Sequence, residues 1–327
     1  MTNLILPDGN VSNYPPHYLA IEEYVARTYT DDDYFFTWRV EPSAIFGRNQ
    51  LIENEVNQEY CDEHNVKIFR RKSGGGCVYA DLKNIMCSYI TEDIDVHRAY
   101  ATYMGILTEM LNKAGIHAEL SGRNDVMVGG KKVAGTAFYR IPGRSILHNT
   151  LLFDTDLDVM TRVITPNEKK LSSKGVQSVR QHVCNINQFT DMTIEEFEKF
   201  AADAICGGKK RVLTEEDMRG AKEIEDYMLS PEFKFGKNPL YTVRKWQRFE
   251  GVGDFKAFVE LKNDVIKNIN IMGDFFVIGD LDREFLNKLH NVKFDRDAVA
   301  KALEGVDLSS VITGFKLEHL IKLLFED

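Results

Sequence analysis

The sequence lacks the features that mark secreted, zinc-binding and membrane proteins. Its 327 residues include only five cysteines with no C-x-x-C pair, which gives no zinc signature and favours a reducing compartment. No apolar run approaches the roughly 18 residues of a membrane span. The first ten residues have no basic stretch followed by an apolar run, which argues against a secretory signal. We therefore expect a cytoplasmic protein without a membrane partner.

An excess of positive charge is also absent, because the formal net charge is −9 at pH 7. Nucleic acids bind proteins chiefly through basic surfaces, so we expect no nucleic-acid partner. The content of 43% hydrophobic and 28% charged residues is typical of a globular protein with a sizeable core.

The motifs of several large enzyme classes are missing as well. Residues 122–132 lack the spacing of a P-loop, and residues 251–253 lack the third glycine of a dinucleotide fingerprint. The chain has neither an H-E-x-x-H zinc motif nor a G-x-S-x-G nucleophile elbow. A catalytic assignment must therefore rest on other segments.

A turn of paired arginines and consecutive glycines is the most informative segment. Arg70 and Arg71 precede Gly74, Gly75 and Gly76, with apolar runs on both sides. Glycine lets the backbone approach a ligand closely, and successive N–H groups can form an anion-binding concavity. Arginine grips phosphate or carboxylate in a bidentate manner. The alternative is a strand–turn–strand whose glycines only form the turn.

Two charged residues stand at the borders of apolar runs farther along the chain. Asp125 follows a turn, so it could hold magnesium or simply bond its own backbone. Lys132 precedes the small residues Ala134 and Gly135, which leave room for a ligand near its ammonium group. The alternative is a solvated strand lysine, and Lys131 competes for the same role.

A histidine and a basic segment complete the candidates. His148 lies inside the apolar run 145–153, where a core or pocket-wall histidine is favoured over a catalytic base. Residues 169–180 are basic within an acidic chain and form either a solvated loop or a flap over anionic groups.

The order of predicted elements is mixed, which indicates an α+β fold. Helices are predicted over residues 15–27, 53–65 and 97–114, and a capping box at Thr193 predicts another. A meander of strands is predicted at 255–261, 265–271 and 275–278. We expect a large domain over residues 1–247 and a small one over 248–327.

Four ordered segments together resemble the lipoate–protein ligase family. They are Arg70–Tyr79, Gly122–Asp125, Lys132–Ala137 and His148–Leu152. The segments Pro42–Gln50 and Lys170–Arg180 also match the family pattern, and the tail is similar to the accessory domain of two-domain members. The resemblance implies a mixed sheet of the class II aminoacyl-tRNA synthetase/biotin ligase type, with an adenylating, acyl-transferring domain followed by the accessory domain.

The family resemblance implies a two-step reaction, in which ATP and lipoate form lipoyl-AMP before the acyl group passes to a lysine. The implied acceptors are lipoyl carriers, either the glycine cleavage H protein or 2-oxoacid dehydrogenase E2 domains. By resemblance, Asp125 is the candidate magnesium ligand, and Lys132 contacts the α-phosphate and acyl carbonyl as the catalytic residue. The implied ATP-binding residues are Arg71, Gly76, Cys77, Val78, Tyr79 and Lys132. The implied lipoate-binding residues are Trp38, Arg71, Gly75, Gly76, Lys132 and His148.

The sequence departs from the family pattern at Ala80, where histidine is usual, and at Lys83, where glycine is usual. Both departures bear on substrate preference. One rival interpretation is an octanoyl or lipoyl transferase that uses Cys77 or Cys184 as a nucleophile. A biotin ligase is less consistent with the arginine–glycine motif. A second rival is a non-catalytic protein that binds carriers or acyl-adenylates.

Overall fold

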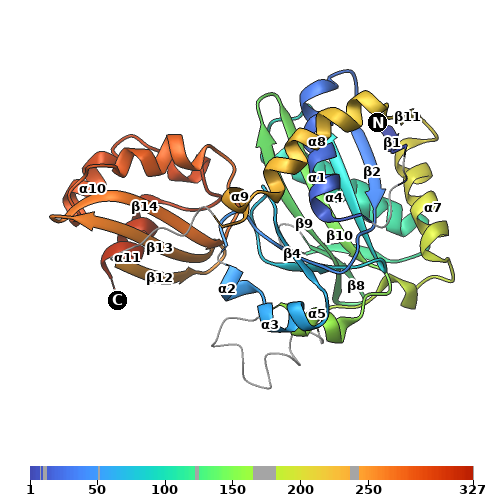
Figure 1. Ribbon diagram of the computed structural model, residues 1–327, viewed down its shortest axis with the longest axis horizontal. Helices are drawn as coiled ribbons and strands as arrows, with labels where there is room; N and C mark the ends of the chain where they lie inside the picture. Colours follow the sequence, from blue (N-terminus) through green and yellow to red (C-terminus); the bar gives the residue numbers. More distant parts are fainter. Residues whose placement is uncertain are drawn as a thin grey trace. The chain divides into compact units, whose positions relative to one another are not determined.

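The computed structural model describes residues 1–7, 9, 13–50, 52–121, 125–164, 182–235 and 243–326. The chain divides into two compact units (Figure 1). The first contains Met1–Phe46, Glu53–Arg71 and Cys77–Ser230, and the second contains Gly47–Ile52, Lys72–Gly76 and Pro231–Asp327. Two short loops from the N-terminal half therefore belong to the same unit as the C-terminal segment.

An eight-stranded sheet organises the first unit, in the order β11-β1-β2-β6-β10-β9-β8-β7. Strand β1 is parallel to β2 and β11, whereas the other neighbours are antiparallel. This mixed sheet confirms the predicted α+β class. The strands are β1 (Thr2–Ile5), β2 (Tyr34–Trp38), β6 (Asn84–Thr91), β7 (Ala118–Ser121), β8 (Asp125–Val128), β9 (Lys131–Ile141), β10 (Arg144–Leu152) and β11 (Lys210–Val212).

A second, three-stranded sheet of this unit has the order β4-β3-β5. Its strands are β3 (Ser43–Phe46), β4 (Lys67–Arg70) and β5 (Val78–Ala80). Strand β3 is parallel to β4 and antiparallel to β5. Arg70 is thus the last residue of β4 and Arg71 follows it, and β5 begins two residues after the last glycine, Gly76.

Helices α1 (Pro15–Thr28) and α4 (Val96–Lys113) cover opposite faces of the large sheet. His148 of β10 contacts Glu22 of α1, whereas the next residue, Asn149, contacts Tyr103 of α4. Successive strand residues point to opposite faces, so the two helices lie on different sides. The other helices among the described residues of the unit are α3 (Gln58–Glu63), α5 (Leu157–Val163), η2 (Ile186–Gln188), α7 (Ile194–Cys206) and α8 (Glu215–Leu229), together with α2 (Ile52–Glu55), which begins in the second unit.

Local signals account for the helix starts. Pro15 and Pro16 occupy the first turn of α1, where proline is well tolerated. The predicted capping box opens α7, with Thr193 and Glu196 bonding each other's backbone N–H groups. The prediction of one helix over 53–65 is wrong, because Val56 forms a β-bridge with Ile164 and separates α2 from α3.

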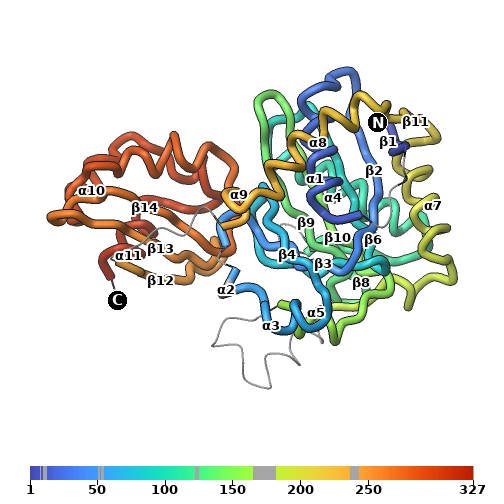
Figure 2. The backbone as a smooth tube through the Cα atoms, in the orientation of Figure 1, coloured from blue at the N-terminus to red at the C-terminus, as the bar shows by residue number. Residues whose placement is uncertain are grey.

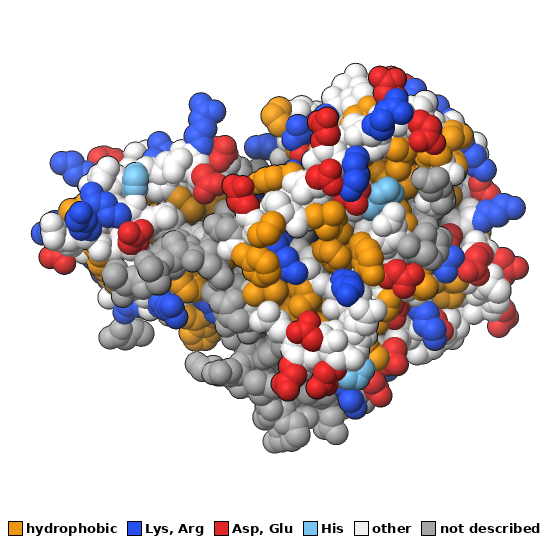
Figure 3. Space-filling model, viewed as in Figure 1, with side chains coloured by type: hydrophobic (Ala, Val, Ile, Leu, Met, Phe, Trp, Pro, Cys, Tyr) orange, Lys and Arg blue, Asp and Glu red, His pale blue; other side chains and the backbone are white. Residues whose placement is uncertain are grey.

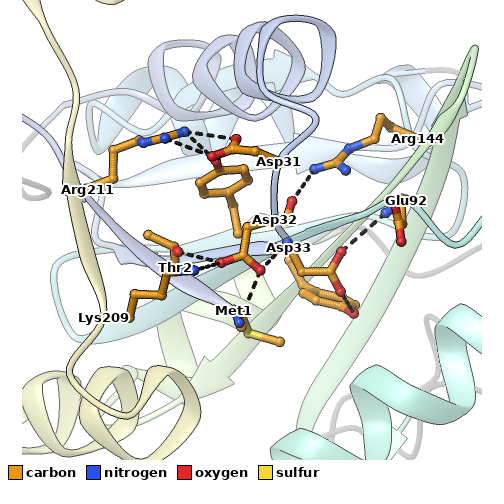
Figure 4. A network of polar contacts seen from close by, with 11 residues as sticks. Met1, Thr2, Asp31, Asp32, Asp33, Glu92, Arg144, Lys209 and Arg211 are labelled. Carbon is orange, nitrogen blue, oxygen red and sulfur yellow. Dashed lines mark hydrogen bonds and ion pairs between the residues drawn. The ribbon is translucent and has the colours of Figure 1, made fainter.

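An acidic turn before β2 ties several strand ends together (Figure 4). Nη2 of Arg211 lies 2.9 Å from Oδ2 of Asp31. Asp32 Oδ2 accepts hydrogen bonds from Thr2 at 2.7 Å and Lys209 at 2.5 Å, and Arg144 Nη2 donates to the Asp32 carbonyl at 2.7 Å. These contacts join residues of β1, β10 and β11 to the entrance of β2.

The second unit is built on an antiparallel meander of β12 (Val243–Phe249), β13 (Gly253–Lys262) and β14 (Val265–Asp274) (Figure 2). Phe255 is central to its core and stacks on Phe275 and Phe315, with ring centroids 4.7 and 4.5 Å apart. The helices that the structure describes in this unit are α9 (Pro231–Phe235), η3 (Leu281–Phe285), η4 (Leu286–Leu289), α10 (Arg296–Ala302), η5 (Leu308–Ser310) and α11 (Leu317–Phe325).

The third strand of the meander differs from the prediction. Residues 275–278 form no strand, because Phe275 turns into the core and Val277 makes only an isolated bridge to Ile312. The third strand is β12 instead, which precedes the other two. The boundary predicted between residues 247 and 248 lies within β12, whereas the compact units divide after Ser230.

Two features are relevant to possible membrane contacts: the length and apolarity of the helices, and the distribution of charge on the surface. None of the described helices is both long and apolar enough to cross a membrane. On the face drawn in Figure 3, the described acidic and basic side chains are interspersed rather than separated by sign.

Candidate functional site

The glycine turn requires its glycines for close backbone contacts. A Cβ on Gly47 would lie 2.2 Å from the carbonyl oxygen of Gly75, so a side chain there would force the two loops apart. Gly75 has φ = 82°, a left-handed conformation that favours glycine. The N–H of Arg48 donates to the Ser73 carbonyl at 2.9 Å and closes the loop pair. The turn is therefore shaped by contacts between the two loops of the second unit.

Arg71 is held firmly by the first unit. Its side chain is buried, and Nη1 donates to the Ile45 carbonyl of β3 at 2.8 Å. Its backbone N–H donates to the Phe46 carbonyl at 3.0 Å. A guanidinium fixed in this way has lost most of its side-chain freedom before any ligand binds, which lowers the entropic cost of binding an anion.

The residues after the glycines continue into β5. Val78 and Tyr79 pair with β3, and Tyr79 is buried while Cys77 and Val78 are partly buried. The two departures from the family pattern lie nearby. Ala80 is fully buried in β5, and the turn at Lys83 closes without glycine because Asp81 Oδ1 accepts the Lys83 N–H at 2.9 Å.

Lys132 and Asp125 face each other across the β8–β9 hairpin. Gly129 and Gly130 form its turn with φ values of 56° and 77°, a conformation that favours glycine. Nζ of Lys132 lies 2.8 Å from Oδ1 of Asp125, and both side chains are about one-third exposed. Lys131, by contrast, is exposed, which favours Lys132 over Lys131 as the site lysine.

Gly135 provides the space that Lys132 occupies. A Cβ on Gly135 would lie 3.0 Å from both Cε and Nζ of Lys132. The small residue thus makes room for the lysine side chain itself, on the same face of the hairpin as Asp125. The rest of the predicted Gly122–Asp125 turn and the basic segment 169–180 lie outside the described residues.

A buried polar chain links Trp38 and His148, which are 110 positions apart in the sequence. Trp38 Nε1 donates to Ser88 Oγ at 2.7 Å, and Ser88 Oγ donates to Glu22 Oε1 at 2.5 Å. Nδ1 of His148 lies 3.0 Å from Glu22 Oε2. All four side chains are buried, so this carboxylate is paired and hydrogen-bonded, as a buried charge must be.

Glu22 and Ser88 were not predicted from the sequence. The available signal was a glutamate on the face of α1 that also carries Tyr18, Ile21 and Val25. A charged residue within a buried stripe usually has a specific partner. His148 is buried and has Glu22 as a partner, and its expected place in a pocket wall stays a prediction.

The cysteines have the environment of unreactive thiols. Burial raises the pKa of Cys77 far above its ordinary value, and burial also raises the pKa of Cys184. A cysteine nucleophile needs a lowered pKa, because the thiolate is the reactive form. The surroundings of these two cysteines therefore argue against a thioester mechanism.

The described residues contain no group of three or more histidine, cysteine or acidic side chains placed to hold a metal ion. Magnesium is commonly held by one or two carboxylates together with substrate phosphates. Asp125 fits this pattern as a single carboxylate, and its buried Oδ1 makes no well-directed hydrogen bond to the described residues. Its donor chemistry is compatible with magnesium that arrives with a nucleotide.

Two family models match the chain. The lipoyl protein ligase A/B catalytic domain matches residues 15–206, and the bacterial lipoate protein ligase C-terminus matches residues 238–324. Lipoate–protein ligase 1 of Staphylococcus aureus is 34% identical to this chain, and the alignment covers 98% of this chain and 99% of the relative. Lipoate-protein ligase LplJ of Bacillus subtilis is 32% identical, and the alignment covers 98% of this chain and 100% of the relative.

Solved structures show the same fold. LipL1 of P. falciparum, in complex with lipoate, has a TM-score of 0.77 at 19% identity over 98% of this chain and 97% of its own. A bipartite ligase of Thermoplasma acidophilum, described with its E2 lipoyl domain, has a TM-score of 0.66 at 25% identity, covering 74% and 98%. Lipoate-protein ligase A bound with ATP has a TM-score of 0.62 at 25% identity, covering 71% and 97%. This chain belongs to the lipoate–protein ligase family, as its motifs predicted.

Proposed function

We propose that the protein activates lipoate with ATP and then transfers the lipoyl group to a lysine of a lipoyl carrier domain. In the first step a carboxylate oxygen of lipoate attacks the α-phosphorus, and pyrophosphate leaves. In the second step the carrier lysine attacks the acyl carbonyl, an amide forms and AMP leaves. Its relatives of similar length are named lipoate–protein ligases, which is the observation that carries this proposal.

In this proposal Lys132 is the catalytic residue. Its ammonium is held by Asp125 and its side chain is about one-third exposed, so it can turn toward a developing negative charge. It would contact the α-phosphate and the acyl carbonyl and stabilise the charge that builds up there. Magnesium bound with ATP would neutralise phosphate charge, and Asp125 is the residue of this chain that would supply a carboxylate to it.

The remaining roles are assigned to residues at the glycine turn, in β5 and in the large sheet. The anchored Arg71 and the backbone of Gly76, Cys77, Val78 and Tyr79 would hold ATP. Lipoate would bind along Trp38, Gly75 and His148, with Arg71, Gly76 and Lys132 at its carboxylate end. We propose catalysis by residues 1–247, in the cytoplasm, with residues 248–327 as an accessory domain.

The acceptor is proposed to be a lipoyl carrier, because one relative of known structure is described with its E2 lipoyl domain. An E2 domain and a glycine cleavage H protein are the two candidates. Separate incubations of the full chain with ATP, magnesium, lipoate and each apo carrier should show which carrier gains the lipoyl mass. No mass gain on either carrier would contradict the proposal.

Lys132→Gln tests the site directly. We expect it to lower the rate of lipoyl-AMP formation by about 10²- to 10³-fold, the usual effect of removing one charge-stabilising donor. Lys131→Gln is the matched control, since it removes the same charge from the adjacent, exposed position. Equal rates for the two variants would exclude Lys132 from the reaction.

A further inference from the structure

Oxygen atoms of the C-terminal segment lie against the glycine turn. The N–H of Gly75 donates to the carbonyl of Phe275 at 3.4 Å. A Cβ on Gly74 would lie 2.7 Å from the same carbonyl oxygen, so this approach depends on glycine. The Gly75 N–H belongs to the turn that is predicted to bind an anion. In this structure it donates instead to a carbonyl group of the same chain.

The segment that supplies this acceptor is firmly held. Phe275 is 1% exposed and stacks on Phe255 with an angle of 4° between the rings. The N–H of Gly273 donates to the carbonyl of Asn49 at 2.7 Å. Residues 273–275 therefore contact both loops of the second unit, 47–52 and 72–76, through the backbone.

A carboxylate lies between these two backbone contacts. Oδ2 of Asp274 is 3.8 Å from the position that a Cβ of Gly76 would take. Asp274 also stands directly opposite Asp254 in the β13–β14 register. Nη1 of Arg248 lies 3.7 Å from Oδ2 of Asp254, so the facing carboxylate has its own partner. Asp274 places a second negative charge, and this one lies beside the glycine turn.

We propose that Asp274 is an internal anion that competes with the nucleotide for the glycine turn. In this proposal the carboxylate beside Gly76 takes the place of a phosphate oxygen, so ATP would have to displace residues 273–275 to reach the backbone of Gly76. The apparent ATP affinity is then the intrinsic affinity multiplied by the fraction of molecules in which the C-terminal segment leaves the turn free. This inference rests on the proposed ATP-dependent function.

The test is the ATP affinity of the full-length Asp274→Asn variant, measured by calorimetry without lipoate. We expect binding at least about threefold tighter than that of the parent protein, because the competing charge is gone. Asp264→Asn is the matched control, since it removes an exposed carboxylate at the opposite end of the same hairpin. The control should bind ATP as the parent does.

An unchanged or weaker affinity for Asp274→Asn would overturn the inference. Asp274→Ser removes the same charge and serves as a second variant in case Asp274→Asn folds poorly. The thermal unfolding temperatures of both variants should match that of the parent protein. Failure of the proposed function is distinguishable, because the parent protein would then neither bind ATP nor add lipoate to a carrier.

Discussion

Oε2 of Glu22 lies 3.0 Å from Nδ1 of His148, and neither side chain is more than 5% exposed. Through Ser88, the same carboxylate also reaches the indole N–H of Trp38. One buried charge on α1 thus fixes the orientation of two side chains that we assign to the lipoate site. The substrate itself need not contact Glu22 for the residue to matter.

Glu22→Gln should raise the KM for lipoate about tenfold, with a smaller effect on the KM for ATP. The amide has one acceptor oxygen where the carboxylate has two, so either His148 or Ser88 loses its hydrogen bond to residue 22, at a cost of about 1–3 kcal/mol. Glu23→Gln is the control, because Glu23 is equally buried but pairs with Arg27. Steady-state kinetics that show the same KM change in both variants would argue against a positioning role for Glu22.

Gly135→Ala should lower adenylate formation at least about tenfold while leaving the fold intact. The added methyl group would lie 3.0 Å from Nζ of Lys132 and displace the ammonium from its place beside Asp125. A displacement of this order is costly for a catalytic group. In Gly105→Ala, the methyl group meets no atom within 4 Å in α4, and we expect full activity and a stability gain of about 0.5–1 kcal/mol. A fully active Gly135→Ala enzyme would show that the Lys132 position is not critical.

Stability should depend on pH through Glu198. Burial raises its pKa to about 7, although Arg39 opposes the shift and Glu195 adds to it. A raised folded-state pKa contributes stability that is complete below the unfolded value of about 4.3 and is lost as pH rises through 7. Glu198→Gln should therefore gain stability relative to the parent between pH 4.5 and 7.5, by up to about 3 kcal/mol.

Urea denaturation at several pH values measures this difference. Glu195→Gln is the control, because Glu195 pairs with the same Arg39 but is exposed and has a lowered pKa. Its stability difference from the parent should not grow with pH in the same way. Parallel pH profiles of the parent and Glu198→Gln would refute the assignment.

The double variant Cys77→Ala, Cys184→Ala should keep adenylation and transfer rates within about twofold of the parent. Both thiols have pKa values raised by burial, so neither supplies a thiolate readily. Transfer to an apo lipoyl domain, followed by mass spectrometry, measures this. Loss of transfer with adenylation intact would instead support the acyltransferase interpretation.

Local features of this protein were accessible from its sequence because they depend on neighbouring residues. The Gly129–Gly130 turn, the capping box at Thr193 and the proline start of α1 each follow from the conformational preferences of a few adjacent residues. The family follows from ordered motifs that stand in short, continuous segments. The sequence by itself therefore determined the fold class, the family and the candidate residues.

Tertiary structure decided the features that join distant positions. Glu22 is 66 residues from Ser88 and 126 from His148, so no local pattern could indicate that they share one hydrogen-bonded chain. The break at Val56 depends on a bridge to Ile164, and the place of β12 in the meander depends on its pairing with β13. The physical reason is the same in each case: a buried polar group or strand edge must find a partner, and only the folded chain determines which partner is within reach.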